Sequence, residues 1–122
     1  MSERLATERL IKTRYRIIWT VGDDTICEVM WPREPGYQLI KELIVPILEA
    51  DLDHVSVMAD FDGGTNYNRA DMFVDSEGML KELPINAEAT TIYYRATALR
   101  GQPRATHSIH GNAILFARRI WF

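Results

Sequence analysis

Two histidines three positions apart, His107 and His110, are the first candidates for metal or acid–base chemistry in this chain. On a strand, residues at this spacing point to opposite faces, so the two imidazoles converge on one ion only if their segment is a loop. A zinc site would also need a further ligand, from Cys27 or a distant carboxylate. The pattern favours solvent-facing or locally hydrogen-bonded histidines, and we expect no metal site and no cofactor.

Other patterns that could carry chemistry are incomplete. The acidic run from Asp60 to Gly64 lacks the sixth-position glycine and the twelfth-position glutamate of a calcium-binding loop, so it is typical of a hairpin turn. Ser108 does not lie in a G-x-S-x-G elbow, and no glycine-rich phosphate loop is present. We therefore assign no catalytic residue. A small hydrolase or nuclease acting through His107, His110 and carboxylates is the least favoured alternative.

Arginines gather late in the sequence, although the formal net charge of the chain is -3. Residues 1–83 carry 9 basic and 16 acidic side chains, whereas residues 84–122 carry five arginines and a single acidic residue, Glu88. A basic face of this kind would suit an anionic ligand or an acidic partner surface. The alternative is that the two halves neutralise each other within the fold or across a subunit interface.

An anion site is expected where these arginines approach the start of a helix. Asn86 is placed to cap a helix whose first N–H groups and positive dipole end would face the anion. Guanidinium groups suit phosphate, and Phe73, Tyr93 or Tyr94 could stack on a base, although core packing is the favoured alternative for Phe73 and Tyr93. The candidate ligand-binding residues are Arg69, Phe73, Asn86, Thr90, Tyr94, Arg95, Arg104, Arg118 and Arg119.

The elements that would position these residues can be read from the hydrophobic period. Alternation from Tyr15 to Val21, a Gly-Asp-Asp turn, and Cys27, Val29 and Trp31 predict a β-hairpin. A helical stripe follows over residues 39–48, with Pro46 inside it, where it should kink or split the helix. Residues 1–13 are expected to form a short amphipathic helix or a frayed arm.

The second half repeats this plan. Residues 54–62 and 69–75 alternate on either side of the turn DGGTN, which predicts a second hairpin. Asn86 opens a helix that Gly101 and Pro103 end, and a last strand covers roughly residues 111–122. The order ββαββαβ predicts an α+β fold, with a mainly antiparallel sheet and two helices covering one of its faces.

Length and composition limit the remaining possibilities. A chain of 122 residues is expected to form a single domain, and its apolar share of 47% is ordinary for a globular protein. The charged N-terminal segment and the lack of a long apolar run predict no signal peptide, no membrane span and a cytoplasmic location. Duplex nucleic acid is an unlikely partner, because the chain is acidic and no helix carries a dense basic stripe.

Two stretches, RADMFVDSEGMLKELPINAEATTIYYRA and HGNAILFARRIWF, carry a resemblance to a known family. With these motifs, which cover about the last half of the chain, the sequence resembles a small domain family of unknown function found mostly in phages, plasmids and their bacterial hosts. In size and element order it is also similar to phage sponge proteins that counter the Thoeris defence system. Those oligomers sequester a cyclic ADP-ribose signal, which implies roles for Asn86, Phe73 and arginines of the C-terminal half.

The sequence thus predicts a non-enzymatic counter-defence protein of a phage or plasmid. It would sequester an anionic, nucleotide-type signal in the host cytoplasm, as a homo-oligomer packed through its aromatic C-terminal residues. The alternative is a protein-interaction module that inhibits or adapts a host protein through a sheet edge or its arginines.

Overall fold

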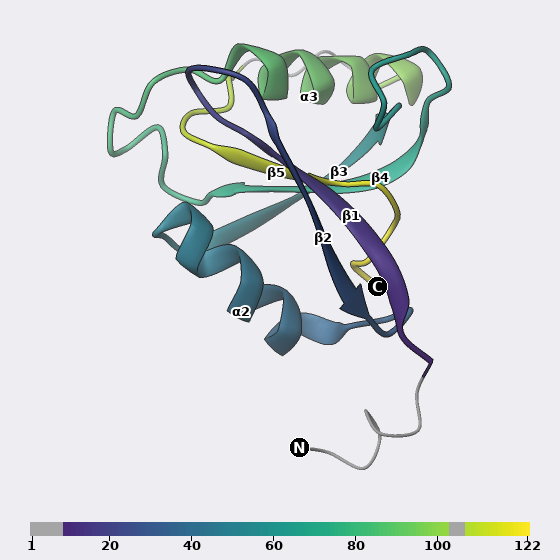
Figure 1. Ribbon diagram of the computed structural model, residues 1–122. Helices are drawn as coiled ribbons and strands as arrows, with labels where there is room; N and C mark the ends of the chain where they lie inside the picture. Colours follow the sequence, from purple (N-terminus) through teal and green to yellow (C-terminus); the bar gives the residue numbers. More distant parts are fainter. Residues whose placement is uncertain (1–8, 103–106) are drawn as a thin grey trace.

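The computed structural model describes residues 9–102 and 107–122, and within these ranges the chain forms five strands and two helices in the expected order (Figure 1). The strands are β1 (Ile11–Ile18), β2 (Thr25–Trp31), β3 (Leu52–Ala59), β4 (Asn68–Asp75) and β5 (Ala113–Phe116), and the helices are α2 (Gly36–Leu48) and α3 (Ala87–Leu99). The predicted α+β class is therefore confirmed.

All strand pairs in the sheet are antiparallel, and the sheet order is β2-β1-β5-β4-β3. The two hairpins, β1–β2 and β3–β4, do not pair with each other. Instead β5 lies between them, with Ile17 opposite Ile114 on one side and Phe73 opposite Ile114 on the other. The last strand in the sequence is thus the central strand of the sheet, and β2 and β3 form its edges.

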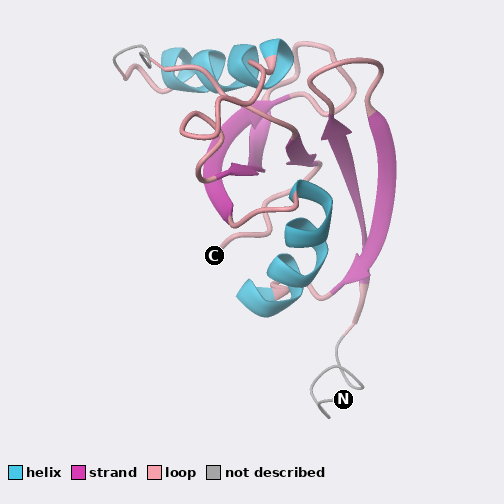
Figure 2. Cartoon of the chain, turned by 90° about the vertical axis from the view of Figure 1, so that its left-hand side faces the viewer, coloured by secondary structure: helices cyan, strands magenta, loops and turns pink. Residues whose placement is uncertain are grey.

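The two helices cover opposite faces of the sheet, so the expectation that they share one face is wrong (Figures 1 and 2). The reason lies in β4, where residues from Ala70 to Asp75 are buried on both faces. Alternate residues of β4 supply two separate cores: Met72 belongs to the core under α3, and Phe73 to the core above α2.

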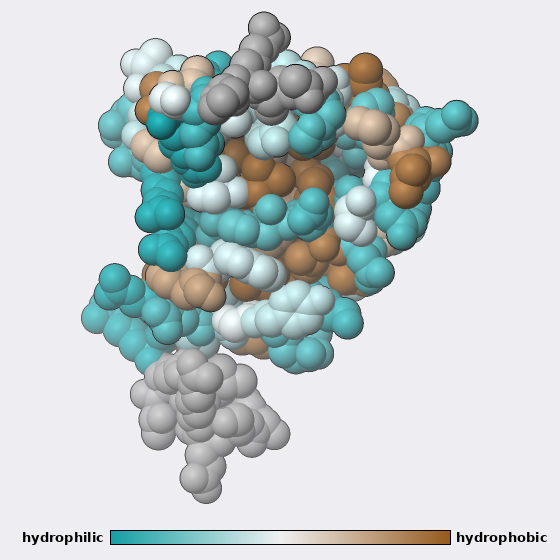
Figure 3. Space-filling view, turned by 180° about the vertical axis from the view of Figure 1, so that it is seen from behind, coloured by the Kyte–Doolittle hydropathy of each residue, from teal (hydrophilic) through white to brown (hydrophobic). Residues whose placement is uncertain are grey.

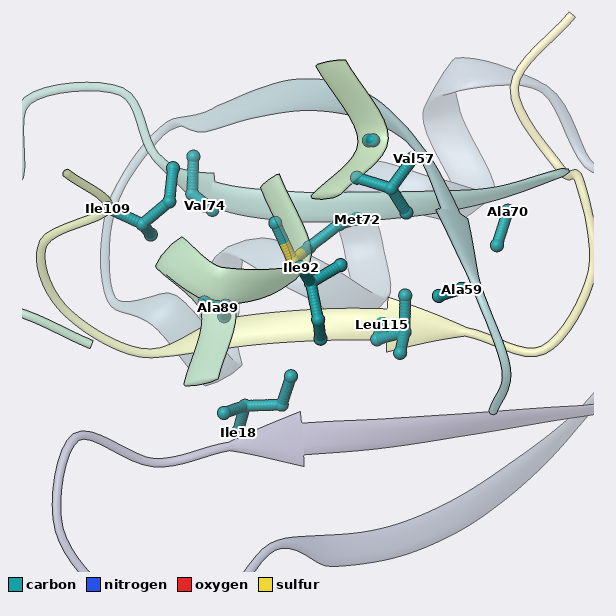
Figure 4. Close-up of a cluster of buried hydrophobic side chains, with 12 residues drawn as sticks. Ile18, Val57, Ala59, Ala70, Met72, Val74, Ala89, Ile92, Ile109 and Leu115 are labelled. Carbon is teal, nitrogen blue, oxygen red and sulfur yellow. The ribbon is translucent and has the colours of Figure 1, made fainter. Parts of the chain in front are cut away.

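The core under α3 is aliphatic. Ala89, Ile92 and Ala96 of the helix belong to one cluster with Met72 and Leu115 of the sheet. Figure 4 shows Ala89 and Ile92 facing Met72 and Leu115. The core on the α2 side is aromatic and is closed by Ile40 and Ile44. The helix α2 is not split, because Pro46 falls in its last turn.

Both ends of the described chain depart from the expected boundaries. The first strand starts at Ile11 instead of Tyr15, and Thr13, which was expected to end a short helix or a frayed arm, is buried in this strand. The last strand stops at Phe116. Beyond it the chain leaves the sheet, because the buried carboxylate of Asp71 accepts hydrogen bonds from the backbone N–H groups of Ile120 (2.7 Å) and Trp121 (2.8 Å). Residues 117–122 therefore form a segment packed on the α2 side.

Candidate functional site

The structure does not gather the predicted arginines into one basic face. Arg95 lies on α3, with its guanidinium 5.0 Å from the ring centre of Tyr67, whereas Arg118 and Arg119 lie after β5 in the segment on the other side of the sheet. Arg69 is exposed at the start of β4. Arg104 lies outside the described residues. The expected arrangement was wrong because α3 and the C-terminal segment belong to opposite layers.

Arg118 is a structural clamp. Its Nε donates to Thr13 Oγ1 (3.0 Å), and its terminal nitrogens donate to the backbone carbonyls of Arg33 (2.7 Å) and Pro32 (3.0 Å). Burial lowers the pKa of Arg118, and the charge of Arg33 lowers it further. These bonds fasten the C-terminal segment to β1 and to the β2–α2 connection, so few of the donors of Arg118 remain for a ligand.

The start of α3 is sealed instead of open. Asn86 is buried, and its Oδ1 accepts a hydrogen bond from Ala89 N (3.1 Å), which confirms its role as the N-cap. Its amide nitrogen donates to the carbonyls of Ile18 (2.8 Å) and Gly111 (3.1 Å). The hydroxyl of Thr90 is likewise engaged, since it accepts from Ile109 N at 2.9 Å. Asn86 and Thr90 therefore tie segments together.

The predicted aromatic residues divide between core and surface. Phe73 is fully buried, with Phe116 edge-on at 5.7 Å, so its ring has no face for a ligand and core packing is the correct interpretation. Tyr94 is half-buried beside Arg95 in a shallow hollow on the outer side of α3. Among the candidate residues that the structure describes, Arg95 and Tyr94 thus line a common surface hollow.

A groove of about 430 Å³ lies elsewhere, between the C-terminal half of α3, the sheet end formed by β3 and β4, and the segment before β5. Its floor is apolar and made of buried or half-buried side chains, namely Val55, Val74, Ala96 and Ile109. Figure 3 shows the side of the molecule that carries the edge strand β3, where apolar atoms lie among hydrophilic ones. An apolar floor with a polar rim is typical of small-molecule sites.

The rim of this groove carries an arginine. Arg100, at the end of α3, donates a hydrogen bond from its terminal nitrogen to Ser56 Oγ of β3 at 2.8 Å. Across residues 9–102 and 107–122, no carboxylate forms an ion pair with Arg100. The buried carboxylate of Asp75, which also lines the groove, is instead occupied by Lys81 Nζ at 2.9 Å and by Glu77 N at 2.8 Å. The guanidinium of Arg100 is thus not paired with a carboxylate among the described residues, although the exposed carboxylate of Asp53 lines the same groove.

Aromatic rings and hydroxyl groups complete the rim. Tyr93 and His107 both line the groove, with ring centres 5.4 Å apart. His110 is fixed by a contact of 2.9 Å between its Nδ1 and the carbonyl of Leu83.

Within the described part of the chain, no cluster of three or more histidine, cysteine, aspartate or glutamate residues is placed to hold a metal ion.

Sequence reasoning missed this site for identifiable reasons. Tyr93 falls on the buried stripe of α3, so the helical period of the hydrophobic residues predicts a core position. The side chain does pack against the core, and it also lines the groove. Ser56 belongs to no sequence motif that would mark it as a binding residue. The late gathering of arginines was the one available signal, and Arg100 is the member of that group that lines this groove.

Comparison with known proteins identifies no relative. No protein family matches the chain, and no curated protein or solved structure matches it significantly. Neither of the described helices is long and apolar enough to cross a membrane.

Proposed function

We propose that the groove binds a small anionic ligand of the nucleotide type and holds it without chemical change. The observation that carries the proposal is the guanidinium of Arg100, which lies without a carboxylate partner among the described residues, at the rim of a cavity with an apolar floor. A phosphate accepts bidentate hydrogen bonds from such a group.

The rest of the groove supports a ligand with both an anionic and a flat aromatic part. Tyr93 and His107 offer rings on which a base could stack. Ser56, Ser108 and Gln102 offer hydrogen-bonding groups around the rim. A volume of about 430 Å³ lies within the usual range for ligand sites. The sponge proteins use arginine, aromatic and asparagine side chains, and this groove has the first two kinds but no asparagine among its described residues.

A sequestering role is favoured over catalysis. The nitrogen Nδ1 of His110 faces a carbonyl at 2.9 Å instead of a nucleophile, and Ser56 Oγ meets a guanidinium, which is no general base. A counter-defence role, in which the bound signal is withheld from its receptor, rests on the sequence resemblance alone, because no protein family matches the chain. Assembly into oligomers is part of this proposal.

The proposal is tested by thermal shift with a panel of cyclic nucleotides and ADP-ribose derivatives. A ligand at one hundred times its dissociation constant stabilises the folded state by about 2.7 kcal/mol, so the melting temperature must rise. The variant Arg100→Gln should abolish this rise. The matched control is Arg95→Gln, which removes an arginine from the same helix but outside the groove, and which should leave the rise intact. No shift with any compound, or equal loss in both variants, would contradict the proposal.

A second candidate function is a protein-interaction module, favoured by the edge strand β2. Ile26 is 66% exposed and Met30 is 53% exposed on the same face of this strand. If this face binds a host protein, Ile26→Glu should abolish capture of a stoichiometric partner from host lysate, and Arg100→Gln should not. Release of a small molecule from the denatured natively purified protein would favour the groove instead.

A further inference from the structure

The edge strand β2 lacks the features that usually protect the edge of a sheet. Its residues, Thr25–Trp31, contain no proline and a single charged side chain, that of Glu28. They pair with β1 in an unbroken register, so no bulge turns this strand away from a partner. The other edge strand, β3, is partly covered, because Arg100 of α3 donates a hydrogen bond to its Ser56 at 2.8 Å. An open edge such as β2 tends to pair with a further strand.

The pairing pattern shows which backbone groups of β2 face outward. The carbonyl of Arg14 accepts from Ala117 N at 3.0 Å on the β5 side, so the backbone groups of Arg14 point away from β2. Because this direction alternates along an antiparallel pair, Glu28, which lies opposite Arg14, directs its own N–H and C=O toward the free edge. The same holds two residues away on either side, at Ile26 and Met30. These three residues therefore offer their N–H and C=O groups to a strand outside the described sheet.

The side chains of the same three residues stand on one face in a symmetric order. Ile26 is 66% exposed, Met30 is 53% exposed, and the exposed Glu28 lies midway between them. If two β2 strands pair antiparallel about a two-fold axis at Glu28, Ile26 of each copy lies opposite Met30 of the other. This register also uses every outward N–H and C=O group of both strands. The strand is therefore self-complementary in its backbone and in its apolar side chains.

The charges of this face fit the same arrangement. Glu28 lies opposite Arg14 in the hairpin, and Lys12 Nζ is 3.7 Å from its carboxylate. Two Glu28 carboxylates repel each other at the axis, but each keeps these two cations of its own copy beside it. Across the joined strands the charges then run positive, negative, negative, positive, so the repulsion at the centre is offset.

We propose that β2 is a homodimer interface, at which two copies of the chain join their sheets into one continuous antiparallel sheet. The inference gives the oligomer of the proposed function a specific surface, and it rests on that function for nothing else. It needs no ligand, because the groove lies at the other end of the sheet, beside β3 and β4. A host protein is the competing occupant of this edge, and it would leave the purified protein as single chains.

Sedimentation equilibrium of the full chain tests the association. The mass should rise with concentration from 14.1 kDa toward twice that value. Amide hydrogen exchange then locates the interface: the N–H groups of Ile26, Glu28 and Met30 should become protected as the concentration rises. The N–H groups of Cys27 and Val29 already face β1 and should change less. A single-chain mass up to about 1 mM, or a dimer in which the three outward amides gain no protection, would overturn the proposal.

Variants that reverse one charge separate this edge from general surface effects. Glu28→Lys places two cations opposite each other at the axis, beside Lys12 and Arg14, and should raise the dissociation constant of the dimer about tenfold or more. Asp53→Lys is the matched control, because it makes the same change at an exposed position of the other edge strand, and it should leave the dissociation constant unchanged. Equal effects of the two variants would refute the interface. Arg100→Gln should dimerise like the unsubstituted chain, so a failure of the anion groove is distinguished from a failure here.

Discussion

Asp71→Ala should destabilise the protein more than any ordinary surface change. The carboxylate is nearly inaccessible, with 3% of its side chain exposed, and one oxygen lies 2.7 Å from His54 Nε2. The other oxygen accepts from the N–H groups of Ile120 and Trp121. Alanine leaves the buried N–H of Ile120 and the part-buried N–H of Trp121 without a partner, and each unsatisfied group costs about 1–3 kcal/mol. The expected loss is therefore about 4 kcal/mol of the free energy of unfolding.

This loss is measurable in two ways. Urea unfolding followed by circular dichroism gives the free energy directly, provided that the transition is two-state. In a chain of this length, a loss of about 4 kcal/mol corresponds to a fall of about 15 °C in melting temperature. Asp53→Ala is the matched control, since Asp53 is exposed on the neighbouring strand, and its effect should stay within about 0.5 kcal/mol.

Asp71→Asn distinguishes the lost charge from the lost acceptors. An amide oxygen can still accept from both backbone N–H groups, and the amide nitrogen can donate to a neutral His54, so we expect a loss of about 1–2 kcal/mol. A loss below about 1 kcal/mol for Asp71→Ala would refute the view that this carboxylate anchors the C-terminal segment.

Three further predictions concern single side chains. Asn86→Ala removes a helix cap and the donor to two buried carbonyls, and should cost about 2–4 kcal/mol in urea unfolding. Arg118→Gln should lower the melting temperature and hasten proteolysis near the C-terminus, whereas Arg119→Gln, at an exposed position, should do neither. Burial raises the pKa of Glu88, and Asp24 raises it too, while Arg16 lowers it. Because the pKa of Glu88 is higher in the folded state than in the unfolded state, the free energy of unfolding falls as pH rises through the range in which carboxyl groups titrate. Glu88→Gln should therefore not destabilise the protein at pH 7, and it should reduce this fall in stability with pH. A lower melting temperature for Glu88→Gln at pH 7 would contradict this.

The local elements could be predicted from the sequence because they depend on neighbouring residues. Alternation gave both hairpins, and Asn86 with Glu88 marked the start of α3, which the structure confirms. The placement of the two helices was predicted wrongly, on one face of the sheet instead of two, although β4 held a signal. Its run of Ala70, Met72 and Val74 interleaved with Phe73 reads as a strand covered on both faces, but its two aspartates suggested a solvent face.

The candidate site was less predictable, because it depends on contacts between distant segments. The local pattern of residues 117–122 does not predict that their backbone leaves the sheet and donates hydrogen bonds to the carboxylate of Asp71. This one contact separates Arg118 and Arg119 from the arginines of α3. A period of two or 3.6 residues describes faces within an element, and it carries no information on which layer an arginine joins.

The central position of β5 has a consequence for how the protein folds during its synthesis. Until Ala113–Phe116 have been synthesised, the edges of β1 and β4 that later pair with β5 are unpaired. The two hairpins are then separate ribbons, which are marginal in water and prone to stick to other chains. A nascent chain stalled before residue 113 should therefore depend on chaperones. The β1–β2 and β3–β4 hairpins should join into one sheet only when β5 pairs with both of them.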